Sequence, residues 1–285
     1  MFSADSTRRQ PARAGRRPDP APSATRCGRR QWRYNDRNAG VAQLVERRLP
    51  KPEVASSRLV ARSSLPALTV TAKNTYIVYG QKGTGSVPVE ATLLLLGAPY
   101  KVVERAEQDH PAPEGLSSEE FSQVNPLRQV PALVLPNGEL MTESAAILTH
   151  LADSHPASRL SPALDDARRP AFLRWMAFVS AQIYGLIWVT DDPLRLAPRD
   201  EDAPLIVERV RERIAQCWRM MDQQVSPGRY ILGDDLSVLD LYVTVVSSWG
   251  PRRPRFYQEA PRMAEVVRRV DADPRLTQFW LKRFS

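Results

Sequence analysis

The stretch VNPLRQVPALVLPNGELMTESAAILTHL (Val124–Leu151) restricts the possible folds of this chain more than any other segment. Its apolar run Ala132–Leu135 predicts a strand, although the run follows Pro131, which has no N–H to donate to a sheet. The next residues, Pro-Asn-Gly, favour a tight hairpin turn, because Asn and Gly tolerate positive φ. Glu139–Met141 is then the returning strand, and Ser144–Ser154 has a helical pattern. The segment therefore predicts a hairpin whose second strand leads directly into a helix.

Strands and helices alternate before this hairpin. Thr75–Tyr79 is β-branched and aromatic, Val87–Gly97 is a helical run that ends on glycine, and Tyr100–Glu104 reads as a second strand. A strand, a helix and a strand within so short a span indicate a parallel βαβ unit with a right-handed crossover. Ser117–Val124 is a short helix whose start has the spacing of a capping box. The order β-α-β-α-β-β-α predicts an α/β domain over residues 73–155.

The pattern changes after this domain, because the remaining segments are helical and no strand is predicted among them. Prolines mark the junctions between the helical segments. The chain is therefore expected to end in an all-α domain over residues 162–285. Its predicted helices are Asp165–Val189, Asp202–Val225, Val238–Trp249, Met263–Asp271 and Pro274–Lys282.

The clearest helix start in the second domain is the segment LSVLDLYV. Ser237 at the N-cap position and Asp240 three residues later form a capping box, in which the acid is shorter than the usual Glu. Leu236 before the cap and Leu241 after it have the spacing of a hydrophobic staple. We interpret this segment as a structural feature that starts a buried helix, with no part in the chemistry.

The first 72 residues differ from the rest in charge. They hold 15 Lys and Arg against 5 Asp and Glu, whereas the remainder holds 25 against 27. High net charge with low hydrophobicity predicts a disordered extension. It is an organelle transit peptide, a basic tail that binds nucleic acid non-specifically, or the product of a start placed too far upstream. The third interpretation is favoured, because Ala39–Ser63 resembles a translated transfer-RNA gene region and Val70 offers a later start.

Several functional classes receive no support from the composition. The nearly neutral part after residue 72 gives little indication of a nucleic-acid-binding fold. Cys27 and Cys217 are the only cysteines, so a reducing compartment fits the chain better than a disulfide framework. No apolar run approaches the ~20 residues of a membrane span, and a secretory signal is missing, which predicts a cytoplasmic protein. His110, His150 and His155 lack ligand partners at metal-binding spacing, so no metal is expected.

Three motifs, NPLRQVPAL, TESAAIL and LSVLDLYV, occur in this order and resemble the cytosolic glutathione S-transferase family over roughly residues 74–285. The resemblance implies a thioredoxin-like N-terminal domain, an all-helical C-terminal domain and a homodimer. It also implies an enzyme that joins the thiolate of glutathione, as a substrate, to a small hydrophobic electrophile. Two alternatives remain within the same fold: a glutathione-dependent disulfide or peroxide reductase, and a non-catalytic module for protein association.

The resemblance assigns glutathione-binding roles to four residues. In that family the proline at the position of Pro131 follows a cis peptide bond, and the backbone of Val130 pairs with the cysteinyl part of glutathione. The alternative is an edge strand whose first N–H would face solvent. At the next helix start, Ser144 would hold the γ-glutamyl carboxylate and Glu143 its ammonium group. The alternative there is an ordinary helix cap.

Thiol activation in that family uses a Tyr, Ser or Cys near the end of the first strand, whose hydrogen bond to the thiolate lowers the thiol pKa. The candidates here are Ser86 and, second, Thr84. Gly85 stands where the bacterial cysteine-type enzymes carry their cysteine, so a mixed disulfide at that position is not expected. The alternative for Ser86 is an ordinary N-cap.

Two further residue pairs complete the predicted site. Arg128 and Gln129 would contact the glycyl carboxylate of glutathione or lie at the rim of the cleft. Tyr184 and Trp188 lie one turn apart on the first long helix of the second domain. They would contact the apolar co-substrate or, as is common for aromatic pairs at helical spacing, pack in the core.

Overall fold

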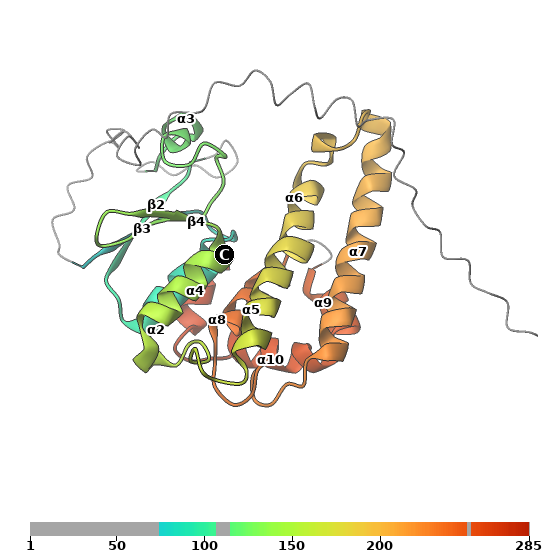
Figure 1. The fold of residues 1–285 in the computed structure, drawn as a ribbon. Helices are drawn as coiled ribbons and strands as arrows, with labels where there is room; N and C mark the ends of the chain where they lie inside the picture. Colours follow the sequence, from blue (N-terminus) through green and yellow to red (C-terminus); the bar gives the residue numbers. More distant parts are fainter. Residues whose placement is uncertain (1–73, 107–114, 250–251, 285) are drawn as a thin grey trace, which may run out of the picture. The chain divides into compact units, whose positions relative to one another are not determined.

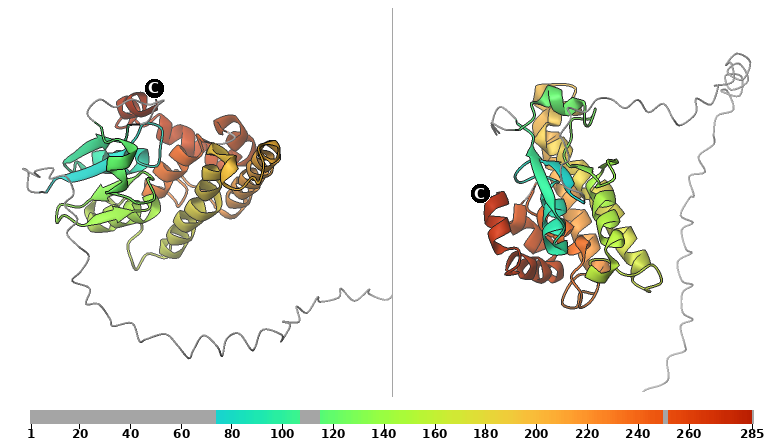
Figure 2. Two further views of the ribbon diagram at one scale, coloured as in Figure 1. Left: turned by 90° about the horizontal axis from the view of Figure 1, so that it is seen from above. Right: turned by 90° about the vertical axis from the view of Figure 1, so that its left-hand side faces the viewer.

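The computed structural model describes residues 74–106, 115–249 and 252–284, whose arrangement is shown in Figures 1 and 2. The predicted disordered extension, residues 1–72, lies outside the described residues. The described part consists of a small mixed sheet with its helices, followed by a larger set of helices. Both belong to one unit of the chain.

Four strands form the sheet, in the order β2-β1-β3-β4. The edge strand β2 runs parallel to β1, with Tyr76 opposite Tyr100, and β3 runs antiparallel to both β1 and β4. Because side chains alternate along a strand, Tyr76 and Val78 face one core and Ile77 and Tyr79 face another. The strands are β1 (Tyr76–Gly80), β2 (Tyr100–Glu104), β3 (Ala132–Val134) and β4 (Leu140–Thr142).

The helices of the sheet region cover both faces of the sheet. Helix α2 (Val87–Leu96) links the two parallel strands and packs with α4 (Ser144–Ser154) on one side, as Figure 1 shows. Helix α3 (Ser118–Ser122) places Phe121 against the other side. The capping box predicted before α3 is present, since the Ser117 N–H donates to Glu120 Oε2 at 2.9 Å. This order of elements confirms the thioredoxin-like topology.

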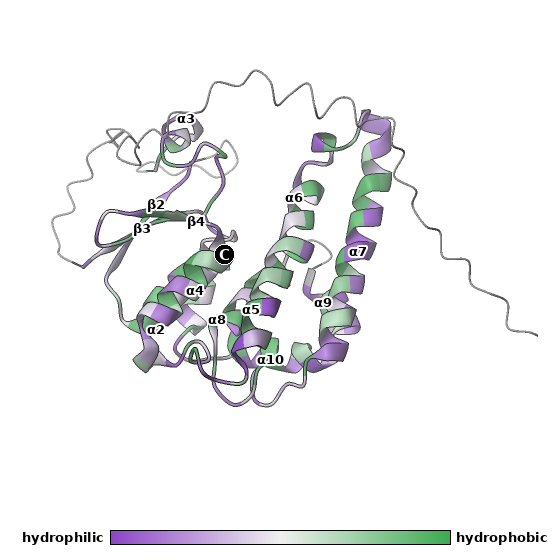
Figure 3. Cartoon of the chain, viewed as in Figure 1, coloured by the Kyte–Doolittle hydropathy of each residue, from purple (hydrophilic) through white to green (hydrophobic). Residues whose placement is uncertain are grey.

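The rest of the described chain is helical, as predicted. Helix α8 is its centre, because every residue of that helix is buried, and it contacts α2, α4, α5 and α10. Helix α7 alternates hydrophobic and hydrophilic residues, which Figure 3 shows along its length. The helices are α5 (Arg169–Phe178), α6 (Gly185–Asp191), α7 (Ala203–Gln224), α8 (Val238–Val246), α9 (Arg252–Glu259), α10 (Pro261–Asp271) and α11 (Thr277–Phe284), with short turns η2 (Pro156–Ser158), η4 (Pro193–Arg195) and η5 (Asp200–Asp202).

Two features of the helical region differ from the expectations. The long helix predicted from residue 165 begins at Arg169, where Pro170 fits the first turn, and it contains a π-helical segment, η3 (Val179–Tyr184). Helix α9 was not expected, because prolines were interpreted as junctions. Pro254 lies in the first turn of α9, where a missing N–H costs no helical hydrogen bond.

The segment 169–191 is, within the described part of the chain, the one helical run long and apolar enough to span a membrane. The core helix of a globular protein passes the same test of length and composition. Here Phe172, Trp175 and Ile183 pack in the main hydrophobic core, against helices α7 and α8. We therefore interpret the segment as a core helix.

The capping box predicted at the start of α8 is confirmed. The carboxylate of Asp240 accepts hydrogen bonds from the N–H of Ser237 at 2.8 Å and from its hydroxyl at 2.7 Å. It also accepts a bond from the N–H of Ile231 at 2.8 Å, which ties the preceding loop to the helix. Asp240 is fully buried, and burial raises its carboxyl pKa to about 6. Leu236 and Leu241 are both buried, as the hydrophobic staple requires.

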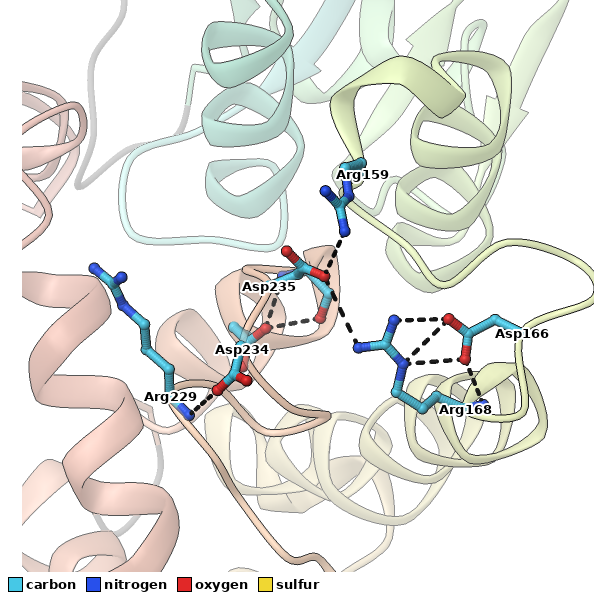
Figure 4. Close-up of polar contacts among 8 residues, drawn as sticks. Arg159, Asp166, Arg168, Arg229, Asp234 and Asp235 are labelled. Carbon is cyan, nitrogen blue, oxygen red and sulfur yellow. Dashed lines mark hydrogen bonds and ion pairs between the residues drawn. The ribbon is translucent and has the colours of Figure 1, made fainter.

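Charged side chains surround the loop that leads into α8, as Figure 4 shows. Arg159 pairs with Asp235 at 3.2 Å, and Arg168 lies 3.9 Å from the same carboxylate. Arg168 also pairs with Asp166 at 2.7 Å. Because these side chains are accessible to solvent, which screens their charges, these pairs contribute little to stability. The buried Asp240 is therefore the main polar anchor of this loop.

Candidate functional site

A cleft of about 1200 Å³ lies between the sheet region and the helical region. Its walls come from the loop after β1, the loop before β3, the start of α4 and the segment 180–195. The cleft brings together most of the residues predicted for the site. These are Thr84, Arg128, Gln129, Val130, Pro131, Glu143, Ser144, Tyr184 and Trp188, whereas Ser86 is not among its lining residues.

The loop before β3 presents backbone groups to the cleft. The Val130–Pro131 peptide bond is cis, as expected, and in the described part of the chain no backbone hydrogen bond involves Val130. Asn125 shapes this loop from within, since its Nδ2 donates to Gln129 O at 2.7 Å and its Oδ1 accepts from Leu127 N at 3.1 Å. Asn125 was not predicted as a site residue, although an Asn that bonds its own backbone two residues later is a known turn signal.

The start of α4 forms the second polar wall. Glu143 is the N-cap residue, with φ 67°, and its side chain makes no capping hydrogen bond. The alternative of an ordinary side-chain cap is therefore not realised at this helix. The Ser144 hydroxyl is buried and donates to Tyr242 Oη at 3.0 Å, which joins the start of α4 to α8. Uncapped N–H groups at a helix start favour an anion.

Ser86 does not lie where the expected contact with a thiol requires it. It is completely buried, and its hydroxyl donates to Glu90 Oε1 at 2.9 Å while accepting from Gln81 N at 3.1 Å. A Cβ at Gly80 would lie only 2.5 Å from the Ser86 hydroxyl, so the glycine makes room for this inward orientation. The ordinary N-cap alternative is not realised either, because Ser86 makes no capping hydrogen bond.

Thr84 lies in the cleft wall and is half-buried. Its hydroxyl donates to Gln81 O at 2.7 Å and lies 3.3 Å from Ser86 Oγ. The hydroxyl proton of Thr84 is therefore already used in a hydrogen bond within the loop after β1.

A buried ion-pair network behind this loop was missed by the sequence analysis. Arg283 of α11 lies 2.8 Å from Glu90 Oε1 and also pairs with Glu104. Its carbonyl accepts from Gly83 N at 3.0 Å, and the indole of Trp249 donates to Gly83 O at 2.7 Å. The C-terminal helix thus fixes the cleft wall. No local motif marks these contacts, because they join residues up to 193 positions apart.

The network predicts a pH dependence of folding. Burial raises the pKa of the Glu90 carboxyl to about 7, although Arg283 and Ser86 act in the opposite direction. The folded chain then binds more protons than the unfolded chain between the ordinary Glu pKa and pH 7, so Glu90 lowers stability as pH rises through this range. We expect the unfolding free energy of Glu90→Gln, measured in urea, to lack this decline of up to about 3 kcal/mol. The exposed carboxylate variant Glu139→Gln should keep it, and equal pH slopes in both variants would contradict the assignment.

Tyr184 and Trp188 both reach the cleft, but in different environments. Tyr184 is half-buried, with its ring 4.9 Å from the ring of Trp249 and 6.4 Å from that of Tyr242. Trp188 is 39% exposed, and the guanidinium of Arg195 lies 4.4 Å over its ring. The core-packing alternative thus applies in part to Tyr184 and not to Trp188.

No candidate metal-binding site is found among the residues that the structure describes. No group of three or more His, Cys, Asp or Glu side chains is placed there to hold an ion. His150 and His155 lie in this part of the chain, whereas His110 and Cys27 lie outside it. Cys217 is buried within α7.

The comparisons with known proteins agree with this architecture. A family model described as "Glutathione S-transferase, N-terminal domain" matches residues 86–154. An uncharacterized GST-like protein of Escherichia coli K12, YncG, is 34% identical over 207 residues, which cover 72% of this chain and 97% of the relative. The glutathione S-transferase GstA of Escherichia coli O157:H7 is 25% identical over 136 residues, 47% of this chain and 63% of the relative.

Solved structures share the fold. A glutathione transferase homolog from Sulfitobacter with bound glutathione matches with a TM-score of 0.63 and 21% identity, over 73% of this chain and 98% of that chain. A sphingomonad glutathione S-transferase complexed with glutathione matches with a TM-score of 0.57 and 23% identity, over the same shares.

Proposed function

The chain belongs to the glutathione S-transferase family, and from this premise we propose that it binds glutathione in the cleft and joins the glutathione thiolate to a small hydrophobic electrophile. One observation carries the proposal. The cis Val130–Pro131 segment and the uncapped start of α4 at Glu143 and Ser144 line the same cleft. The solved relatives described with bound glutathione support the choice of ligand.

The proposed binding mode uses backbone and helix-end groups. The free N–H and C=O of Val130 pair with the cysteinyl backbone of glutathione. The N–H groups at the start of α4 hold the γ-glutamyl carboxylate, and Glu143 pairs with the ammonium group. Arg128 and Gln129 at the rim attract the glycyl carboxylate. The apolar electrophile then lies toward Trp188 and Ile187, on the helical side of the cleft.

The proposed reaction needs thiol activation and positioning by the protein. The thiol proton passes to solvent, and the thiolate sulfur forms a bond to an electrophilic carbon. In a substitution, the leaving group departs with the electron pair of the broken bond. In an addition, the carbon skeleton takes up a proton from solvent. We further propose, from the resemblance to the family, that the protein acts in the cytoplasm as a homodimer.

The first test is glutathione binding by calorimetry to the full chain. We expect Ser144→Ala to weaken binding about 10-fold or more, because in the proposed complex the Ser144 hydroxyl turns from Tyr242 to the γ-glutamyl carboxylate, and a hydrogen bond to a charged group contributes ~1.5–3 kcal/mol. Ser154→Ala, an exposed serine at the other end of the same helix, should leave the affinity unchanged. Thermal unfolding of both variants controls for the lost contact between Ser144 and Tyr242.

The outcomes separate the proposal from its alternatives. A folded chain that does not bind glutathione would be a protein-association module with the transferase fold. A chain that binds glutathione, reduces a disulfide or peroxide and conjugates no electrophile would be a reductase that works through glutathione alone. Either result would overturn the conjugation activity proposed here.

A further inference from the structure

The hydroxyl of Tyr184 occupies the space that a side chain at position 85 would fill. A Cβ built on Gly85 would lie 2.3 Å from Tyr184 Oη and 3.1 Å from Pro131 Cδ. The glycine is buried and does not line the cleft, whereas Tyr184 does. The phenol oxygen therefore stands between the start of α2 and the cleft, beside the proline that follows the cis bond.

The position of this hydroxyl is fixed from several sides. The backbone N–H of Gly85 donates to the phenol oxygen. The ring packs 4.9 Å from Trp249, whose indole is itself held by Gly83 O at 2.7 Å. The π-helical segment ends at Tyr184, and its wider turn, in which Gly185 N bonds Ser180 O, sets the direction of the side chain.

The Tyr184 hydroxyl can donate its proton to a ligand in the cleft, which Tyr184 lines. Its oxygen accepts the bond from Gly85, and no acceptor for its proton is found within the described segments. Burial, with smaller contributions from Tyr242, Asp191 and Glu143, raises the pKa of Tyr184, so the phenol stays protonated at neutral pH. By contrast, the Thr84 hydroxyl already donates its proton to Gln81 O, and the Ser86 hydroxyl already donates its proton to Glu90.

We propose that Tyr184 is the catalytic residue that donates a hydrogen bond to the glutathione thiolate, so that the activating hydroxyl comes from the helical region and not from the loop after β1. This inference rests on the proposed function. The thiol proton still passes to solvent, and Tyr184 keeps its own proton throughout. Gly85 is part of the arrangement, because any larger residue there would displace the phenol.

Tyr184→Phe tests the proposal with three measurements on the full chain. Glutathione affinity by calorimetry, measured below the pKa of the bound thiol, should change by less than about 2-fold, since the γ-glutamyl and backbone contacts remain. The ultraviolet absorbance of the bound thiolate, titrated against pH, should shift to higher pH by about one to two units. The kcat/KM for a nitro-activated aryl halide, below the thiol pKa of the variant, should fall roughly 10- to 100-fold.

A double-mutant cycle with Gly85→Ala distinguishes the donor role from a general effect on the cleft. The new methyl group should displace the phenol and reproduce the shifted thiolate titration. In the Tyr184→Phe background, Gly85→Ala should add little, because the hydroxyl is already gone. Fully additive shifts would contradict the shared mechanism.

Two results would overturn the inference and leave the proposed function intact. One is an unchanged thiolate titration in Tyr184→Phe. The other is a shift caused by Thr84→Val and not by Tyr184→Phe. Absence of glutathione binding by the unsubstituted chain would instead overturn the proposed function, and the inference with it. The spectroscopic titration decides the matter even where the chosen aryl halide is a poor substrate.

Discussion

Replacement of Arg283 by Met is expected to destabilise the folded chain by about 3–5 kcal/mol, the effect of breaking a buried ion pair by removing one partner. The Arg283 side chain is 5% exposed and that of Glu90 1%. Without the guanidinium, Glu90 keeps only the Ser86 hydroxyl as a partner in a buried site. The loop after β1 also loses support, since the Arg283 carbonyl, which accepts a hydrogen bond from Gly83 N, would shift with the unanchored end of α11. Glutathione affinity should therefore fall in the same variant.

The pH dependence of this loss identifies its cause. A buried carboxylate without its guanidinium can become neutral by taking up a proton, so the penalty should be larger at pH 8 than at pH 5. Urea unfolding at both values measures it. Lys282→Met, at an exposed neighbouring position, serves as the matched control. The double variant Arg283→Met with Glu90→Gln should recover part of the stability. A loss below about 1 kcal/mol, equal at both pH values, would show that the pair is not an anchor.

Local sequence patterns predicted the sheet region well because the relevant interactions are themselves local. The Pro-Asn-Gly turn joins β3 to β4, and the Ser-x-x-Glu spacing at Ser117 forms its capping box within four residues. The capping box of Ser237 and Asp240 at the start of α8 is likewise a local interaction. Its third hydrogen bond, to Ile231, could not be predicted, since it depends on how the preceding loop folds back.

The hydroxyl group that would activate the thiol could not be predicted from local patterns. Ser86 and Tyr184 both have the right chemistry, and the sequence does not tell which hydroxyl faces the ligand. The choice depends on Gly80, which lets Ser86 turn inward, and on the π-helical segment, which breaks the 3.6-residue period before Tyr184. Arg283 is a third case, because its partners Glu90 and Glu104 lie on other elements.

Replacement of Asp240 by Ala is expected to cost about 3–5 kcal/mol of unfolding free energy. The buried N–H groups of Ile231 and Ser237 would lose their acceptor at about 1–3 kcal/mol each, and the second of these losses is also the loss of the capping box. Asp240→Asn keeps one carbonyl oxygen and should have an intermediate effect. Asp235→Ala, a half-exposed acid in the same loop, should change stability by less than about 1 kcal/mol.

The consequence for function follows from the position of α8. This helix carries Tyr242, which accepts the hydrogen bond from Ser144 at the start of α4. If Asp240 holds only the loop, Asp240→Ala should lower the urea midpoint and leave glutathione affinity intact in the folded protein. If it also sets the position of α8, the affinity should fall together with stability, because the Ser144 hydroxyl would lose its partner. Calorimetry of Asp240→Ala at a temperature well below its unfolding transition separates these two outcomes. A loss of stability below about 1 kcal/mol would contradict the role of Asp240 as an anchor in either case.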